Sequence, residues 1–310
     1  MAFPIDRLPR DILSIIFSLV SEDTPGIKST TQRVPENSLA RCASVSRQWQ
    51  QYIERLTFRK LYVTPHRIAS AVADNILTPQ RLSYLRYIQV EFIVDRRMKR
   101  GRRKESGSVI DHIFEDTVES LFCLLEQAPL RPHPFVIVEF AMPVHSFESR
   151  IRGPVYGLPF TERHTQYPDF DYDKLPTLPM VVSFRMRLLS RVITIEPGKA
   201  CLIAHKMPRL EAVDWEMYDG DRMDIHTRMW LRDGFARNLS KLPKSLKHLS
   251  VKYFRPLRGK DHADQPQSIV PTGSDGDTLS NALFHFTQQN ALTGFYFNDG
   301  VKPSARLQES

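Results

Sequence analysis

The chain has 310 residues, of which 41% are hydrophobic and 25% are charged, as is ordinary for a soluble globular protein of about two domains. It has no apolar run of the roughly 20 residues that a membrane span takes, and its net charge of +8 comes mostly from one short tract rather than from a generally basic surface. The three cysteines, Cys42, Cys123 and Cys201, are far apart and form no CxxC pair. We therefore expect structural, buried thiols, no metal site and an intracellular protein of the cytoplasm or nucleus.

The first predicted element is a helix within MAFPIDRLPRDILSIIFSLV. Its apolar run from Ile12 to Val20 is too short for a membrane span, and Pro9 and Asp11 argue against a signal peptide. On a helical wheel the apolar side chains cover an arc of about 200°, whereas a surface helix typically has a stripe of a little over 100°. We therefore expect this helix to be covered on two sides, by its own domain and by the rest of the chain or a partner.

Two further helices are predicted before residue 62. Residues 21–37 are polar with two prolines, which predicts a surface loop. Ser38 can then cap a second helix, and the spacing of apolar residues from Gln48 to Leu61 predicts a third. Residues 1–61 are thus predicted to form a small all-helical module.

The pattern changes after residue 61 to short strands alternating with helices. Four predicted strands share the spacing L-x-x-L-x-L, carried by Leu85, Ile88 and Val90; by Leu210, Val213 and Trp215; by Leu246, Leu249 and Val251; and by Leu292, Phe295 and Phe297. Two more strand-like runs, PFVIVEF at 134–140 and MVVSFRM at 180–186, lack the full pattern. Helices are predicted between the strands at 108–127, 197–206, 221–242 and 277–289.

A repeated helix and L-x-x-L-x-L strand is typical of a leucine-rich-repeat solenoid, in which each unit covers the apolar face of its neighbour. The strand spacing of roughly 30 to 50 residues is longer and less regular than the 20–29 of that family. We therefore predict an α/β irregular leucine-rich-repeat-like solenoid over 62–310, with long insertions at 143–179 and 255–276. An unrelated α/β domain with buried strands is the alternative.

One basic tract, RRMKRGRRK, accounts for all but one of the net positive charges. Its basic residues are Arg96, Arg97, Lys99, Arg100, Arg102, Arg103 and Lys104. A solvated loop, a nuclear-localisation signal and a nucleic-acid contact are the three interpretations. Single-strand binders interleave basic and aromatic residues, and this tract contains no aromatic residue.

The N-terminal module resembles the F-box family through LPRDILSIIFSLV followed by SLARCASVSRQWQQYIERLTFRKLYV. The positions that match the family pattern are Leu8, Pro9, Ile12, Leu13, Ile16, Phe17, Leu39, Cys42, Val45, Ser46 and Trp49. The loop at 21–37 is longer than in many members. The later stretches LPMVVSFRM, KMPRLEAVDWEMYDGD and GFARNLSKLPKSLKHLSV resemble the C-terminal part of F-box proteins of filamentous fungi.

The resemblance implies a non-catalytic adaptor whose helical module docks on Skp1, and through it on a cullin–RING ubiquitin ligase. The C-terminal domain would then hold an unknown protein substrate, with no cofactor and no membrane contact. The candidate Skp1-binding residues are Leu8, Pro9, Ile12, Leu13, Ile16, Phe17, Leu39 and Val45. Core packing is the alternative role for each of them, and it is the role that we expect for Trp49.

Substrate contacts are expected on the solvent face of the predicted strands, as in other solenoids. The alternate strand positions there are Gln89, Glu91, Asp214, Glu216, Ser250, Lys252, Tyr296 and Asn298. The sequence contains no G-x-G-x-x-G, P-loop, G-x-S-x-G or H-E-x-x-H motif, which argues against an enzyme. The rival functions are a repeat-type interaction protein outside any ligase and a nucleic-acid-binding protein that uses residues 96–104.

Overall fold

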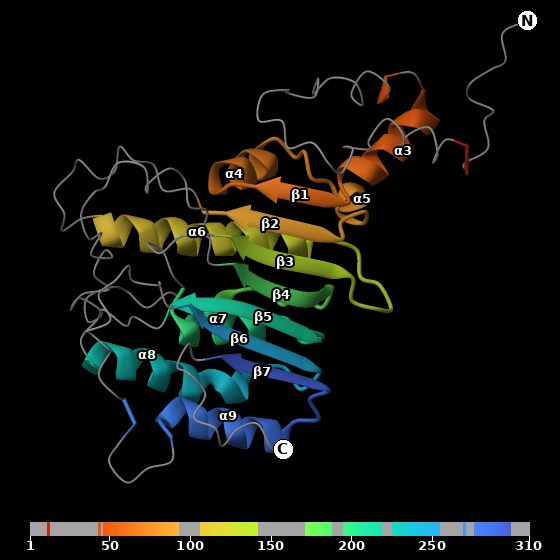
Figure 1. Cartoon of the computed structure of the whole chain (residues 1–310). Helices are drawn as coiled ribbons and strands as arrows, with labels where there is room; N and C mark the ends of the chain where they lie inside the picture. Colours follow the sequence, from red (N-terminus) through yellow and green to blue (C-terminus); the bar gives the residue numbers. More distant parts are fainter. Residues whose placement is uncertain are drawn as a thin grey trace, which may run out of the picture.

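The computed structural model describes residues 11–12, 43–44, 46–92, 106–141, 171–187, 195–218, 225–254, 269–270 and 276–298. Within these ranges a seven-stranded sheet forms, in which every strand pairs in parallel with the next one along the chain (Figure 1). The strands are β1 (Lys60–Val63), β2 (Tyr87–Glu91), β3 (Val136–Ala141), β4 (Val181–Arg187), β5 (Ala212–Tyr218), β6 (His248–Phe254) and β7 (Gly294–Asn298).

Helices connect the strands and cover one face of the sheet. Helix α3 (Arg47–Thr57) precedes the sheet, and the connecting helices are α4 (Pro65–Ala73), α5 (Pro79–Leu82), α6 (Ser106–Glu126), α7 (Pro197–His205), α8 (Ile225–Asn238) and α9 (Thr278–Gln289), with short 3-10 turns η3 (Tyr172–Lys174) and η4 (Leu239–Lys241). Helix α4 packs against α6, α7 against α8, and α8 against α9. All five of these helices, α4 and α6 to α9, contribute side chains to the same core as the inward residues of the strands, so they lie on a common face.

The core is built from two rows of inward residues that run across the sheet. One row contains, in register, Leu61, Ile88, Val138, Phe184, Val213, Leu249 and Phe295, and the other contains Val63, Val90, Phe140, Met186, Trp215, Val251 and Phe297. Aromatic rings meet edge-on from strand to strand, with centroids 5.1 Å apart for Phe140 and Phe184 and 5.8 Å apart for Phe184 and Trp215. Such pairs stabilise the stack beyond simple burial of their area.

Strands β6 and β7 begin with the same backbone hydrogen-bond pattern, in which two successive N–H groups donate to one carbonyl of the preceding segment. The carbonyl of Glu211 accepts the N–H groups of Lys247 and His248 at 2.8 and 2.9 Å, and the carbonyl of Lys247 accepts those of Thr293 and Gly294 at 2.8 and 3.1 Å. The first residue of three of the L-x-x-L-x-L patterns, Leu85, Leu210 and Leu246, is buried just before its strand, whereas Leu292 is partly buried. The region after the N-terminal module is therefore an α/β region with a sequentially ordered parallel sheet, consistent with the predicted leucine-rich-repeat-like solenoid.

The last strand is less covered than the others. Phe295 on β7 is 44% exposed, whereas Leu249, its register partner on β6, is 1% exposed. Within the described ranges β7 has a neighbouring strand on one side, so its inward side chains lack the next repeat that covers the other strands.

The prediction of a helix from Gln48 to Leu61 was wrong at its C-terminal end. Helix α3 stops at Thr57, where Phe58 caps it through its N–H to the carbonyl of Glu54, and residues 60–63 form β1 instead. Pairing with β2 supplies the backbone hydrogen bonds that a continued helix would otherwise provide. The predicted domain boundary after residue 61 falls inside β1, and α4 and α5 were not predicted.

Much of what was predicted for the loops and insertions lies outside the described residues. This holds for the loop 21–37, the start of the second helix at Ser38, the basic tract 96–104 and most of 143–179 and 255–276. The end of the first insertion is described, and there Leu175 and Leu178 are buried in the core. Cys201 is buried as expected, but Cys123 is exposed on α6, so the prediction of buried thiols was wrong there.

Candidate functional site

The face of the sheet opposite the helices carries a band of polar and charged side chains, which we call the open face. In register order one row contains Tyr62, Gln89, Glu139, Arg185, Asp214, Ser250 and Tyr296. A second row, two residues further along each strand, contains Glu91, Ala141, Arg187, Glu216, Lys252 and Asn298. The eight residues predicted for substrate contact all fall in these two rows.

Four polar members of the open face were not predicted: Tyr62, Glu139, Arg185 and Arg187. Three of them lie on β3 and β4, whose sequences PFVIVEF and MVVSFRM lack the L-x-x-L-x-L pattern from which the outward positions were counted. The fourth, Tyr62, lies on β1, which was not predicted as a strand and whose first two residues were assigned to the preceding helix. The two-residue alternation of VSFRMR, with Arg185 and Arg187 between apolar positions, was the signal that could have identified the arginines.

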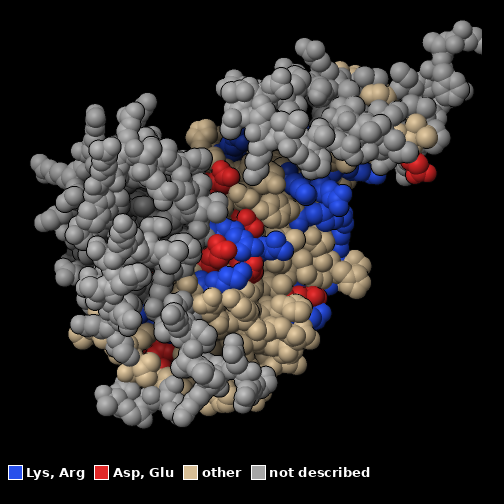
Figure 2. Space-filling model, in the orientation of Figure 1, with Lys and Arg blue, Asp and Glu red and all other residues tan. Residues whose placement is uncertain are grey.

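Arg187 holds the centre of the open face together. Its guanidinium lies 2.7 Å from a carboxylate oxygen of Asp214, 3.0 Å from Glu216 and 3.9 Å from Glu139. Lys252 approaches the other oxygen of Asp214 at 3.5 Å. Figure 2 shows the resulting alternation of acidic and basic surface in the middle of the molecule. Strands β3 to β6 are thus linked by charges across the open face, as well as by their backbone ladders.

The charges around Arg187 shift the pKa values of Asp214 and of Arg187 itself. Partial burial by itself would raise the pKa of Asp214, but the charges of Arg187 and Lys252 and a hydrogen bond from Ser250 together lower it. Partial burial would similarly lower the pKa of Arg187, whereas Asp214 and Glu216 raise it. Both groups therefore remain charged at neutral pH, and the guanidinium and carboxylates hold one another in place.

A series of hydrogen-bonded polar side chains runs along β2. The hydroxyl of Tyr87 donates to Oε1 of Gln89 at 2.8 Å, and Nε2 of Gln89 donates to Oε1 of Glu91 at 3.1 Å. Burial, followed by the nearby carboxylate of Glu139, raises the pKa of Tyr87, so that its hydroxyl stays protonated. The ring of Tyr62 lies 5.8 Å from that of Tyr87, centroid to centroid. Side chains on this part of the open face are already oriented by one another.

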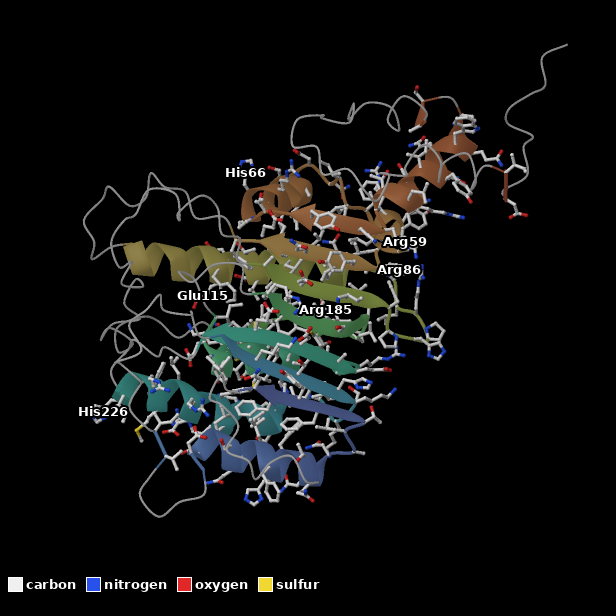
Figure 3. All side chains as sticks on the ribbon, viewed as in Figure 1. Arg59, His66, Arg86, Glu115, Arg185 and His226 are labelled. Atoms are coloured by element: carbon white, nitrogen blue, oxygen red, sulfur yellow. The ribbon has the colours of Figure 1, made fainter. Side chains whose placement is uncertain are left out.

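Arg185 differs from Arg187 on the same strand. It lies in register between Glu139 and Asp214, near the middle of the sheet in Figure 3. Among the described residues it takes part in no ion pair, because the carboxylates on either side approach Arg187 instead. A partly exposed guanidinium of this kind can donate to an acceptor brought by a partner.

The N-terminal module is described mainly through α3. Ser46, a residue of the family pattern, caps α3 by accepting the N–H of Trp49 at 3.3 Å, which gives the serine a physical role. Ile53 is buried in a small cluster with Ala43, Trp49 and two other side chains of α3, in agreement with a packing role for Trp49.

The predicted Skp1-binding residues are mostly outside the described ranges. Ile12 is described and its side chain is 42% exposed. The other seven, Leu8, Pro9, Leu13, Ile16, Phe17, Leu39 and Val45, lie in undescribed segments. Their role in docking therefore remains a prediction.

Two other kinds of site are absent from the described residues. No group of three or more His, Cys, Asp or Glu side chains there is placed to hold a metal ion. Among the helices of the described ranges, none is both long enough and apolar enough to cross a membrane.

Comparison with known families assigns the N-terminal module. Residues 5–64 match the model of the F-box-like family, which covers about a fifth of the chain and extends through β1. No curated protein and no solved structure matches the chain significantly. The chain therefore carries an F-box-like domain at residues 5–64, followed by an α/β region that these comparisons do not assign.

Proposed function

We propose that this chain is the substrate-recognition adaptor of a Skp1–cullin–F-box ubiquitin ligase inside the cell. The F-box-like match at residues 5–64 carries the proposal, because domains of this family dock on Skp1. It is supported by the parallel sheet, which begins with β1 at the end of the module and offers a polar face free of described helices. The adaptor positions another protein for ubiquitin transfer by associated enzymes and performs no chemistry itself.

Docking on Skp1 accounts for the breadth of the apolar surface of the first helix. Burying one Leu or Ile side chain contributes about 1.5–3 kcal/mol. Five such side chains together contribute roughly 10 kcal/mol, against an association cost of at least about 4 kcal/mol. Apolar contacts by Leu13, Phe17 and their neighbours are therefore sufficient for a stable complex that high salt does not dissociate.

The open face is the surface that we propose for the protein substrate. It presents both charge signs over a short distance, and charges arranged in this way select a complementary partner and its orientation. Arg187 and its carboxylate partners are held by one another, so they offer a preorganised surface. Arg185, which forms no ion pair among the described residues, and the exposed rings of Tyr62 and Tyr296 are the side chains of this face that we propose for contact with a partner.

Co-purification of the full chain with Skp1 tests the docking step. We expect a stoichiometric complex in 1 M NaCl, strongly weakened by Leu13→Asp or Phe17→Asp because each places a charge in an apolar interface. Leu130→Asp is the matched control: Leu130 is 74% exposed outside the module, so its replacement should leave both folding and Skp1 binding intact. A folded chain that does not retain Skp1, or variants that bind as well as the control, would contradict the proposal.

The same purification from native cells treated with a proteasome inhibitor distinguishes a ligase adaptor from an interaction protein that works outside a ligase. Cullin and ubiquitinated proteins in the wild-type sample, and their absence from the Phe17→Asp sample, support an adaptor. Skp1 without cullin would instead indicate an interaction protein that works outside a ligase. Proteins lost on Arg185→Glu, with Skp1 retained, would be those held by the open face.

A further inference from the structure

Three arginines gather at the edge of the sheet where the strands begin, away from the centre of the open face. Arg59 directly precedes β1, Arg86 directly precedes β2, and Arg131 lies in the segment before β3. The N–H groups of Arg86 and Tyr87 donate to the carbonyl of Arg59 at 2.9 and 3.1 Å, and the N–H of Ile137 donates to the carbonyl of Arg86 at 2.9 Å. The backbone ladder thus sets Arg59 and Arg86 side by side, as Figure 3 shows.

The side chains of Arg86 and Arg131 converge on one aromatic ring. Their guanidinium carbons lie 4.8 and 4.6 Å from the ring centroid of Phe135, which is a cation–π distance for both. Each also donates to a backbone carbonyl, Arg86 to Leu85 at 2.8 Å and Arg131 to Ser83 at 2.5 Å. The two cations are therefore held close together by neutral partners.

The cluster has no countercharge among the described residues. No ion pair there involves any of the three arginines, whereas Lys247, further along the same edge, lies 3.0 Å from a carboxylate oxygen of Glu211. The pKa of Arg86 is lowered by burial and then by the charges of Arg131 and Arg59, as expected for mutually repelling cations. Figure 2 shows the corresponding basic surface at the edge where β1 and β2 begin.

A fourth arginine, Arg209 in the segment before β5, supports this arrangement. The guanidinium of Arg209 donates to the carbonyl of Arg131 at 3.0 Å and also to that of Pro132. This fixes the segment that carries Arg131 without supplying a negative charge. The cluster is therefore positioned by its surroundings while its positive charge remains uncompensated, which is how a binding site for an anion is prepared.

We propose that Arg59, Arg86 and Arg131 bind a phosphate dianion, either free or as a phosphate monoester. Guanidinium forks match the geometry of phosphate oxygens, and three cations exceed the charge of one dianion, whereas a single carboxylate would neutralise less of the cluster. The ring of Phe135 is stacked by two arginines, so it is not available to stack a nucleobase, which argues for one phosphoryl group rather than a nucleic-acid strand.

Two sources can supply this group: a free small phosphate, and a phosphorylated side chain of a bound protein. The inference does not depend on Skp1, because the three arginines lie just before β1, β2 and β3 and are not among the residues predicted to dock on Skp1. A phosphorylated protein segment would make additional contacts beyond the phosphoryl group, so it should bind more tightly than inorganic phosphate does. Comparing the two affinities therefore distinguishes the sources.

Isothermal titration of the full-length chain tests the site with two probes: inorganic phosphate at constant ionic strength, and phosphoserine peptides beside their unphosphorylated forms. We expect saturable binding of inorganic phosphate that weakens about tenfold in Arg59→Gln and in Arg131→Gln, since each removes a charge-assisted hydrogen bond. Arg67→Gln, which replaces an exposed arginine of α4, is the matched control and should bind like wild type.

Circular dichroism melting of each variant separates loss of binding from loss of folding, and Arg59, being exposed, is the replacement least coupled to the core. Peptide binding at least tenfold tighter than that of inorganic phosphate would identify a phosphorylated protein as the source, and equal or weaker peptide binding would identify a small phosphate. Absence of saturable binding in the folded wild type, or equal binding by Arg59→Gln and the control, would overturn the proposal.

Discussion

Replacing Arg187 by Gln removes a cation that contacts three carboxylates on two different strands. The guanidinium reaches Asp214 and Glu216 on β5 and Glu139 on β3, and Glu139 is itself buried. In the variant these carboxylates face one another without it, and Lys252 is left to neutralise Asp214. We therefore expect a clear loss of stability at neutral pH, although the substitution lies on the exposed side of the sheet.

The size of this loss follows from the exposure of the partners. Removing one member of a fully buried ion pair costs about 3–5 kcal/mol, and an exposed pair is worth about 0–1 kcal/mol. The side chain of Arg187 is 26% exposed, and those of Asp214 and Glu216 are 27% and 29% exposed, which places the network between these limits. We expect a decrease of about 2 kcal/mol in the free energy of unfolding.

The loss should depend on pH in a defined direction. Because the folded-state pKa of Asp214 is lowered, its pairing with Arg187 stabilises the fold fully above the ordinary value of 3.8 and is lost as the pH falls through the lowered value. The variant lacks this contribution at every pH. The difference between wild type and Arg187→Gln should therefore stay constant from pH 7 to 5 and shrink below about pH 4.

Urea unfolding followed by circular dichroism at several pH values measures this difference. At pH 7 a loss of about 2 kcal/mol lowers the urea midpoint by about 0.7 M if the slope is about 3 kcal/mol per molar urea. Arg185→Gln is the matched control on the same strand and face, and it should change stability by less than about 0.5 kcal/mol. Equal losses in the two variants, or a difference that grows on acidification, would refute the reasoning.

Thermal unfolding of four further variants tests two contacts: two glycine substitutions test the packing of α7 against α8, and two substitutions test the buried ion pair at the start of α9. Gly198→Ala on α7 should destabilise by about 1–3 kcal/mol, because the new Cβ would lie 3.0 Å from the carbonyl oxygen of Gly234 on α8. The corresponding substitution on the facing helix, Gly234→Ala, places its new Cβ 3.5 Å from the nearest atom, and it should be neutral or stabilising by up to about 1 kcal/mol. A larger loss of stability in Gly234→Ala than in Gly198→Ala would contradict the assigned packing. Asp277→Asn should cost about 3–5 kcal/mol, because it removes the carboxylate charge that pairs with the buried guanidinium of Arg232, and Ser280→Ala, the control at the same helix cap, should cost far less.

The strands and helices of the α/β region were largely predictable because their signals are local. Burial recurs every second residue in a strand and every three or four in a helix, and positions such as Val213 and Trp215 show this spacing directly. Strand β1 escaped prediction because its four residues, KLYV, follow a helical pattern closely and become a strand only by pairing with β2. Its assignment depended on a neighbour 27 residues away in the chain, at Tyr87.

The sequence by itself determined the F-box-like pattern, the alternation of helices with strands and the solvent-facing side of the four strands with the L-x-x-L-x-L spacing, since all of these depend on residue spacing within one segment. Tertiary structure alone decided which outward side chains meet. Arg187 reaches Asp214 only because β4 and β5 pair in one particular register, and Arg86 joins Arg131 on one ring only because successive turns of the solenoid stack. Contacts between residues tens of positions apart depend on strand register and stacking, which no local pattern encodes.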